Sequence, residues 1–181
     1  MDCITCKKSD HCCIFKKDGF CFVGLKNAEQ IKKKIKKDYS FFLDYSSLPK
    51  KLINELKKDD PALEGALRYK QLDKGKILRL KTQKDGRCIF LNAQGKCEVY
   101  DIRPHICKIY PSWAMKLTNG TIKVIAHDPD FSCNFLKQTE DIELSLSQSE
   151  IAKIKKIFKN IQTEDNYYKK HIKKFVKKKL L

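Results

Sequence analysis

The sequence predicts an α+β fold, with a small mixed core of short antiparallel strands and hairpins and with amphipathic helices around it. Residues 76–127 contain the short strand-like runs ILRL, CIFL and CEVY. In the same region Asn119-Gly120 separates two apolar runs, and both residues tolerate the positive φ of a tight hairpin turn. From residue 147 onward, apolar residues recur at the period of an α-helix. The two periodicities together indicate a mixed fold.

The first part of the chain predicts a strand followed by a helix. Residues 20–25 form a short apolar run that is typical of a strand. Asn27 is the expected N-cap of the helix, because Gln30 stands three residues further on. Ile31 and Ile35 then mark the buried face of this helix.

The middle of the chain predicts further short elements. Residues 41–45, FFLDY, favour a strand. Two short helices should begin near Pro49 and Pro61, because proline suits the first turn of a helix, where its missing N–H has no partner to lose. Residues 115–117 and 121–125 should form the two strands of the hairpin.

The C-terminal part of the chain predicts a pair of amphipathic helices. Ser147 and Glu150 have the spacing of a capping box and should begin the first helix. A second helix should cover about 166–180, so that the two pack as a basic helical hairpin on the core. We therefore expect a core domain over residues 1–135 and a helical extension over 136–181. The inward residues should be Ile151, Ile154, Ile157, Phe158 and Ile161 in the first helix and Ile172, Phe175 and Val176 in the second.

Length and composition indicate an ordered protein without a membrane-spanning helix. The chain has 181 residues, 41% of them hydrophobic, with seven glycines and five prolines, which suits one folded domain with an appendage. We expect a cytoplasmic protein, because no apolar run is long enough to span a membrane and no secretory signal precedes the cysteines.

The charge of +17 does not by itself predict binding to nucleic acid. Only four of the 39 basic residues are arginine, whereas proteins that read bases and phosphates favour its planar guanidinium group. The lysines are also spread along the whole chain rather than clustered. Specific nucleic-acid binding is therefore disfavoured. An acidic partner or a membrane surface remains an alternative role for the basic C-terminal helices.

Seven of the nine cysteines lie in two islands and are the candidate metal ligands. Cys3-x2-Cys6 has the spacing of a metal knuckle, and the adjacent Cys12-Cys13 pair can address two different metals or two corners of one cluster. Seven thiols exceed the four of a structural zinc site, which leaves open a polynuclear zinc site, an iron-sulfur cluster with additional thiols, or one site among noncoordinating cysteines. The candidate ligands are Cys3, Cys6, Cys12 and Cys13 in the first island and Cys88, Cys97 and Cys107 in the second.

Other residues near the islands have weaker signals. Cys133 could return to the site as an eighth metal ligand, whereas Cys21 lies in the apolar run FCFVGL and is expected in the core. Arg103 is the candidate for binding the cofactor, by donating towards a thiolate; its alternative partner is Asp101. His105, beside Cys107, could bind the metal through its imidazole, but a place on the surface or a supporting role beside the ligands is expected instead.

These motifs resemble the YkgJ family, also described as the CxxCxxCC zinc- or iron-chelating domain family. The family pattern is an N-terminal cysteine group ending in Cys-Cys, then Cys-x-Phe-Leu, Gly-x-Cys-x-x-Tyr, Arg-Pro and a cysteine before an aromatic-Pro pair. This sequence matches it at Cys12-Cys13, Cys88, Cys97, Arg103-Pro104 and Cys107. The resemblance covers about residues 1–135. It implies a cysteine cluster that chelates zinc or iron, with an iron-sulfur cluster as one form of the cofactor.

The same resemblance implies an enzymatic alternative. One branch of the family includes the flagellin lysine methylase, so an iron-sulfur-dependent protein methyltransferase, or a redox enzyme with a protein substrate, is the second hypothesis. The sequence has no glycine-rich strand-to-helix loop of the kind that binds a nucleotide-type methyl donor, and no recognisable catalytic triad or pair of carboxylates. Metal binding is therefore the first hypothesis, and the sequence assigns no catalytic residue.

Overall fold

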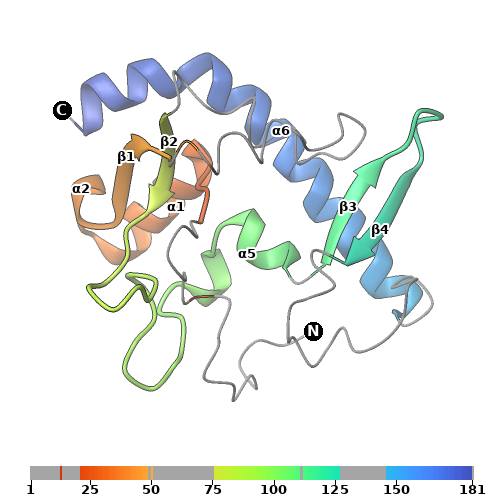
Figure 1. Cartoon of the computed structure of the whole chain (residues 1–181), viewed down its shortest axis with the longest axis horizontal. Coiled ribbons are helices and arrows are strands. Elements are labelled where there is room, and N and C mark those ends of the chain that lie inside the picture. Colours follow the sequence, from red (N-terminus) through yellow and green to blue (C-terminus); the bar gives the residue numbers. More distant parts are fainter. Residues whose placement is uncertain are drawn as a thin grey trace.

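The computed structural model describes residues 13, 21–48, 50, 76–110, 112–126 and 146–180, and these confirm the predicted α+β class (Figure 1). The predicted helices near Pro49 and Pro61 and the predicted boundary near residue 135 lie outside the described residues. No helix within the described ranges has the length and hydrophobicity that crossing a membrane requires. In chain order the elements are α1 (Leu25–Ile35), α2 (Tyr39–Phe42), β1 (Leu43–Ser47), β2 (Lys76–Leu80), the 3-10 helix η2 (Tyr100–Ile102), α5 (His105–Ile109), β3 (Ser112–Lys116), β4 (Ile122–Ala126) and α6 (Gln148–Lys179).

Strand β2 carries a neighbour on each side. Along one edge it pairs antiparallel with β1, from Leu43 opposite Leu80 to Ser47 opposite Lys76. Along the other edge runs the segment 21–23, where Leu80 N donates to Cys21 O at 2.9 Å and Val23 N donates to Leu78 O at 3.2 Å. The predicted strand over 20–25 is thus a short bridged segment rather than a full strand. It is nevertheless held firmly against β2.

The predicted hairpin around Asn119-Gly120 is present as β3 and β4. These strands pair antiparallel from Ser112 opposite Ala126 to Lys116 opposite Ile122. Gly120 has a φ of +84°, a conformation that glycine adopts without strain. The Asn119 side chain accepts a hydrogen bond from Thr121 N at 2.9 Å, which closes the turn.

The C-terminal region is one helix of 32 residues, α6, so the predicted helical hairpin is wrong. Its start is as predicted, because the side chains of Ser147 and Glu150 form the full capping box. No glycine or proline interrupts residues 148–179, so nothing in the sequence breaks the helix. The stretch QTEDN, between the two predicted helices, contains Glu164 and Asp165, and both are buried.

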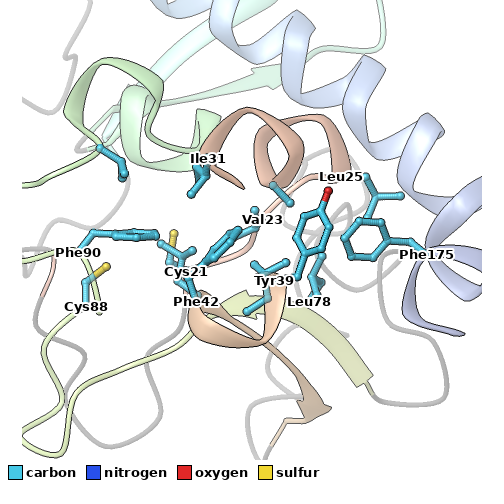
Figure 2. Packing of buried hydrophobic residues seen from close by; sticks show 14 of the residues in the cluster. Cys21, Val23, Leu25, Ile31, Tyr39, Phe42, Leu78, Cys88, Phe90 and Phe175 are labelled. Atoms are coloured by element: carbon cyan, nitrogen blue, oxygen red, sulfur yellow. The ribbon is translucent and has the colours of Figure 1, made fainter. Parts of the chain in front are cut away.

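The apolar residues of α6 belong to two separate hydrophobic cores. They form two groups along the sequence, which is why the sequence suggested two helices. The first half of α6 packs on α5 and the β3–β4 hairpin, and the second half packs on α1 and β2 (Figure 1). Figure 2 shows the second of these cores, where Phe175 approaches Tyr39 edge-on with ring centroids 4.9 Å apart. In that core the buried Tyr168 hydroxyl also accepts a hydrogen bond from Leu78 N at 3.0 Å. One continuous helix therefore joins both cores.

Helix α1 begins three residues earlier than predicted, because its cap comes from a distant part of the chain. Gly24 is the N-cap residue and has no side chain to cap with. Instead, Glu164 of α6 accepts a hydrogen bond from Lys26 N at 2.7 Å. Asn27, the predicted cap, is buried inside the first turn and bonds elsewhere. A carboxylate at a helix N-terminus also interacts favourably with the helix dipole.

Besides the predicted strand over 20–25, three further predicted strands are shorter or absent. Residues 41–45 divide between the end of α2 and the start of β1. Residues 88–91 and 97–100 form turns with single bridges instead of strands. Of the three runs ILRL, CIFL and CEVY, only ILRL, in β2, is a strand as predicted. The reason is that each cysteine run bends back on itself within four residues, as described below.

We expect the substitution Gly24→Ala to destabilise the protein by about 1–3 kcal/mol, the usual cost of overpacking. The backbone at Gly24 suits any residue, with φ of −71°, so the cost is steric: an added Cβ would overlap the Glu164 side chain. Chemical denaturation of Gly24→Ala, with and without Glu164→Ala, measures this. In the Glu164→Ala background, Gly24→Ala should cost much less. Equal costs in both backgrounds would contradict the proposed contact.

The stability of the protein should depend on the ionisation of Glu164. Burial raises the pKa of Glu164 above the ordinary 4.5, and Glu29 adds to this, whereas Lys26 opposes it. The folded state therefore holds this proton more tightly than the unfolded state, so the contribution to stability is present below pH 4.5 and is lost as the pH rises through the folded pKa. Glu164→Gln can still accept from Lys26 N but does not ionise.

The stability of Glu164→Gln relative to wild type should accordingly increase as the pH rises from about 4.5 and then level off. Urea denaturation across this pH range measures the difference. The control Glu98→Gln removes an exposed carboxylate. A constant difference between Glu164→Gln and wild type at every pH would show that Glu164 does not titrate in this way.

Candidate metal centre

Cys88 and Cys97 occupy equivalent positions in two turns of the same shape, nine residues apart. We call residues 81–91 and 90–100 the first and second cysteine turns. Each turn contains one isolated antiparallel bridge that ends at its cysteine, and each contains a glycine with positive φ, +83° at Gly86 and +72° at Gly95. The backbone hydrogen bonds of the two turns correspond one by one, with a shift of nine residues. Those of the first turn are Gln83 N to Arg87 O, Gly86 N to Gln83 O, Ile89 N to Lys81 O and Leu91 N to Cys88 O. Those of the second turn are, in the same order, Asn92 N to Lys96 O, Gly95 N to Asn92 O, Glu98 N to Phe90 O and Tyr100 N to Cys97 O.

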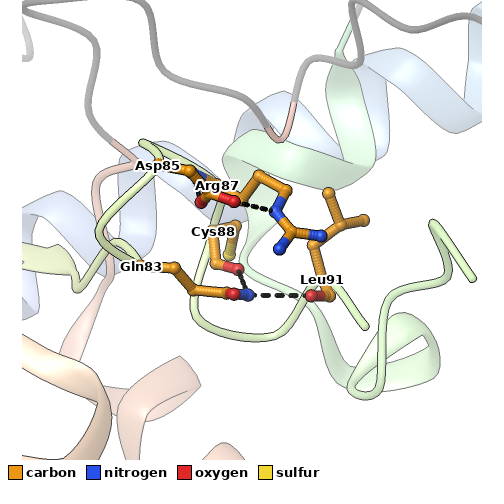
Figure 3. Close-up of polar contacts among 5 residues, drawn as sticks. All are labelled: Gln83, Asp85, Arg87, Cys88 and Leu91. Atoms are coloured by element: carbon orange, nitrogen blue, oxygen red, sulfur yellow. Dashed lines mark hydrogen bonds and ion pairs between the residues drawn. The ribbon is translucent and has the colours of Figure 1, made fainter. Parts of the chain in front are cut away.

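Side chains reinforce each cysteine turn from within. In the first, the Asp85 carboxylate accepts from Arg87 N at 3.2 Å and from Arg87 Nε at 2.6 Å (Figure 3). The hydrogen bond from Arg87 N is the main reason why the pKa of Asp85 lies below its ordinary value. In the second, Asn92 Oδ1 accepts from Gln94 N at 3.1 Å and from Lys96 N at 2.9 Å. Both loops are therefore ordered by their own residues.

Gln83 fixes the backbone around Cys88. Its Nε2 donates to Cys88 O at 3.0 Å and to Leu91 O at 2.8 Å (Figure 3). These two carbonyl groups lie at the two ends of the turn that follows the cysteine. One side chain thus holds the CIFL run in its bent form, which is why this run is not a strand.

One backbone contact joins Cys13, the member of the first island that the structure describes, to Cys88 of the second. Cys88 N donates to Cys13 O at 2.7 Å, although the two residues are far apart in the sequence. Cys13 is partly buried and packs against the core, as do Cys97 and Cys107. The structure therefore brings four of the predicted ligands to the same core. Cys3, Cys6, Cys12 and Cys133 lie outside the described residues.

A second pair of cysteines lies closer still. Cys21 Sγ and Cys107 Sγ are 3.2 Å apart, well beyond the length of a disulfide bond, about 2.05 Å. Cys21 is buried in the core, as its apolar neighbours in the sequence predicted. Its contact with Cys107 was not predicted. Figure 2 shows Cys21 and Cys88 in this core beside the rings of Phe42 and Phe90.

Helix α5 positions Cys107. Its first residue, His105, donates its backbone N–H to the buried Asn27 side chain of α1 at 3.3 Å. Cys107 N then bonds to Pro104 O at 2.9 Å, as the turn after Arg103-Pro104 predicts. Because α1 begins four residues after Cys21, the contact between Asn27 and His105 also connects the segment of Cys21 to the helix of Cys107.

Positive charge gathers around Cys107. The Arg103 guanidinium group stacks on the Tyr100 ring, 3.9 Å from its centroid. Burial and the nearby Arg103 charge lower the pKa of Lys108, and burial and Lys108 lower the pKa of His105. Asp101, the predicted partner of Arg103, pairs with Lys34 of α1 at 3.5 Å. The charges of Arg103 and Lys108 favour a thiolate at Cys107, whereas the burial of this region opposes it.

The donor set fits a soft metal ion. All five cysteines that the structure describes, Cys13, Cys21, Cys88, Cys97 and Cys107, border the same apolar core. Within the described ranges, no three potential ligands lie close enough together to hold a metal ion by themselves. Sulfur ligands in water-poor surroundings favour zinc and iron over magnesium or calcium.

Comparison with known proteins gives one result. A family model described as "CxxCxxCC: Putative zinc- or iron-chelating domain" matches residues 2–134. No curated protein and no solved structure gives a significant match.

We expect Gln83→Ala to lower the free energy of unfolding by about 1–3 kcal/mol, because Leu91 O loses the Gln83 amide as donor and Cys88 O keeps only the hydrogen bond from Leu91 N. Urea denaturation of the metal-free protein measures this. The matched control is Gln94→Ala, at an exposed position of the second cysteine turn. If the two variants lose equal stability, Gln83 does not hold the first turn.

Proposed function

Because the chain belongs to the CxxCxxCC family of zinc- or iron-chelating domains, we propose that it binds zinc or iron through cysteines from both islands. The observation that carries this proposal is the hydrogen bond between Cys88 N and Cys13 O, which supports convergence of the first island on the second. The family model spans both islands, from residue 2 to residue 134.

The candidate ligands have distinct structural settings. Cys88 and Cys97 stand on two ordered turns, and Cys107 stands on α5. Cys13 would join them with the rest of its island. We propose that the ligands come from these four cysteines together with Cys3, Cys6, Cys12 and Cys133. Arg103 would balance the negative charge of the bound thiolates.

A metal at this site would supply either closed structural coordination, as zinc does, or electron transfer, as an iron-sulfur cluster does. The chain's own contribution is to bring separate thiols together and to limit access of water. The buried rings of Phe42 and Phe90, 5.7 Å apart, form part of that apolar wall. The methyltransferase and redox alternatives receive no additional support from the described residues, so chelation is the function that we propose.

We expect protein purified without oxygen to contain at least about one equivalent of zinc or iron per chain, matching the smallest closed thiolate site. Elemental analysis gives the metal, and a sulfide assay tells an iron-sulfur cluster from zinc. The double substitution Cys88→Ser and Cys97→Ser should weaken binding at least tenfold, by analogy with the loss of supporting residues at metal sites.

The control for this experiment is Lys96→Ala, an exposed position next to Cys97 that offers no sulfur. It should bind metal as wild type does. Folded wild-type protein with less than about a tenth of an equivalent of every transition metal would reject the proposed function, since even one zinc site requires a full equivalent.

A further inference from the structure

We infer that Cys21, which lies outside both cysteine islands, is an additional ligand of the metal that Cys107 binds. This inference rests on the proposed function for the presence of the metal. The observation behind it is the separation of 3.2 Å between Cys21 Sγ and Cys107 Sγ. The two residues are 86 positions apart in the sequence, so the contact is not a consequence of local chain geometry.

Both sulfurs are held by backbone contacts from separate elements. The Cys21 carbonyl accepts from Leu80 N, and Val23 continues the pairing with β2 on the same side. Cys107 is held by the α5 turn, whose first residue bonds to Asn27 of α1. Since α1 begins directly after the segment 21–24, the two supports are joined to each other. The close approach of the sulfurs is therefore built into the fold.

The separation is close to that of two ligands of one metal. Two thiolates on a tetrahedral zinc ion lie about 3.8 Å apart, because each Zn–S bond is about 2.3 Å long. Cys21 and Cys107 need to separate by about 0.6 Å to reach that distance, which small side-chain rotations can supply. In the metal-free protein, one thiol can donate its proton to the other sulfur. Metal binding releases the protons.

The surroundings of the pair require a cation if both thiols ionise. Cys21 is 4% exposed, and its core neighbours are apolar. Two adjacent thiolates in such a place would be strongly unfavourable without a compensating charge. Arg103 and Lys108 lie on the Cys107 side of the pair. A metal ion shared by both sulfurs compensates them directly.

Cobalt(II) binding to the reduced, metal-free protein tests this inference. Each thiolate bound to cobalt adds charge-transfer absorbance in the near ultraviolet, so the intensity reports the number of sulfur ligands. We expect Cys21→Ser and Cys21→Ala to lower this intensity by the contribution of one sulfur ligand. In competition with a chelator, both variants should bind cobalt more weakly by about tenfold or more. The matched control is Ile31→Val, which trims a fully buried side chain of the same core and should leave the spectrum unchanged.

The result that overturns the inference is a Cys21→Ser spectrum and affinity equal to wild type while Cys107→Ser loses both. Cys21 would then be a core residue beside a ligand. If wild type binds no cobalt, zinc or iron, the proposed function itself fails, and the inference falls with it. The two failures are therefore distinguishable.

A second measurement needs no substitution and so does not depend on the folding of a variant. In wild-type protein loaded with cadmium-113, scalar coupling between the metal and the cysteine β-protons identifies each ligand. We expect correlations from one cadmium ion to the β-protons of both Cys21 and Cys107. A correlation to Cys107 without one to Cys21 overturns the inference, as does a disulfide between Cys21 and Cys107 in the metal-loaded protein.

Discussion

The pairing of the segment 21–23 with β2 is the contact on which the rest of the structure depends. Closing the loop between Val23 and Leu78 costs about 4 kcal/mol in chain entropy, and the two backbone hydrogen bonds return only about 1 kcal/mol each. Burial decides the balance, because Val23, Leu78 and Leu80 are almost fully buried and each contributes about 1.5–3 kcal/mol. This contact fixes the position of Cys21, at the start of the segment that leads into α1, relative to β2. The first cysteine turn begins at residue 81, directly after β2 ends.

The parts of the fold that the sequence predicted well are those determined by neighbouring residues. The capping box at Ser147 and the hairpin turn at Asn119-Gly120 need only a few adjacent residues, and both formed as predicted. The start of α1 was misplaced because its cap, Glu164, comes from the other end of the chain. Glu164 is also one reason why the sequence did not predict that α6 is continuous. From the sequence alone, a buried glutamate that caps another helix looks the same as an exposed glutamate between two helices.

The candidate metal site also has features that the sequence predicted and features that it did not. The cysteine spacings identified Cys13 and Cys88, and the structure places their backbones in contact. The repeat of Gly-basic-Cys at residues 86–88 and 95–97 was visible in the sequence as well, and aligning these two short segments would have predicted two equivalent turns. The contact between Cys21 and Cys107 had no such signal, because it depends on β2, α1 and α5 meeting in space. Apolar neighbours in sequence correctly indicated burial of Cys21 but could not indicate what its sulfur would face.

Electrostatics near the cysteines depends on a few residues rather than on the total charge of +17. Most lysines of α1 and α6 are exposed, and at physiological salt their field decays over about 8 Å. Arg103 and Lys108 are partly buried beside Cys107, where screening is weaker, and burial and the Arg103 charge lower the pKa of Lys108. A negative charge on Cys107 would relieve that repulsion. The fold thus orders the backbone of the cysteine turns through its own hydrogen bonds and sets positive charge beside the thiol. Part of the entropic and electrostatic cost of gathering thiolates is met by folding, before any metal arrives.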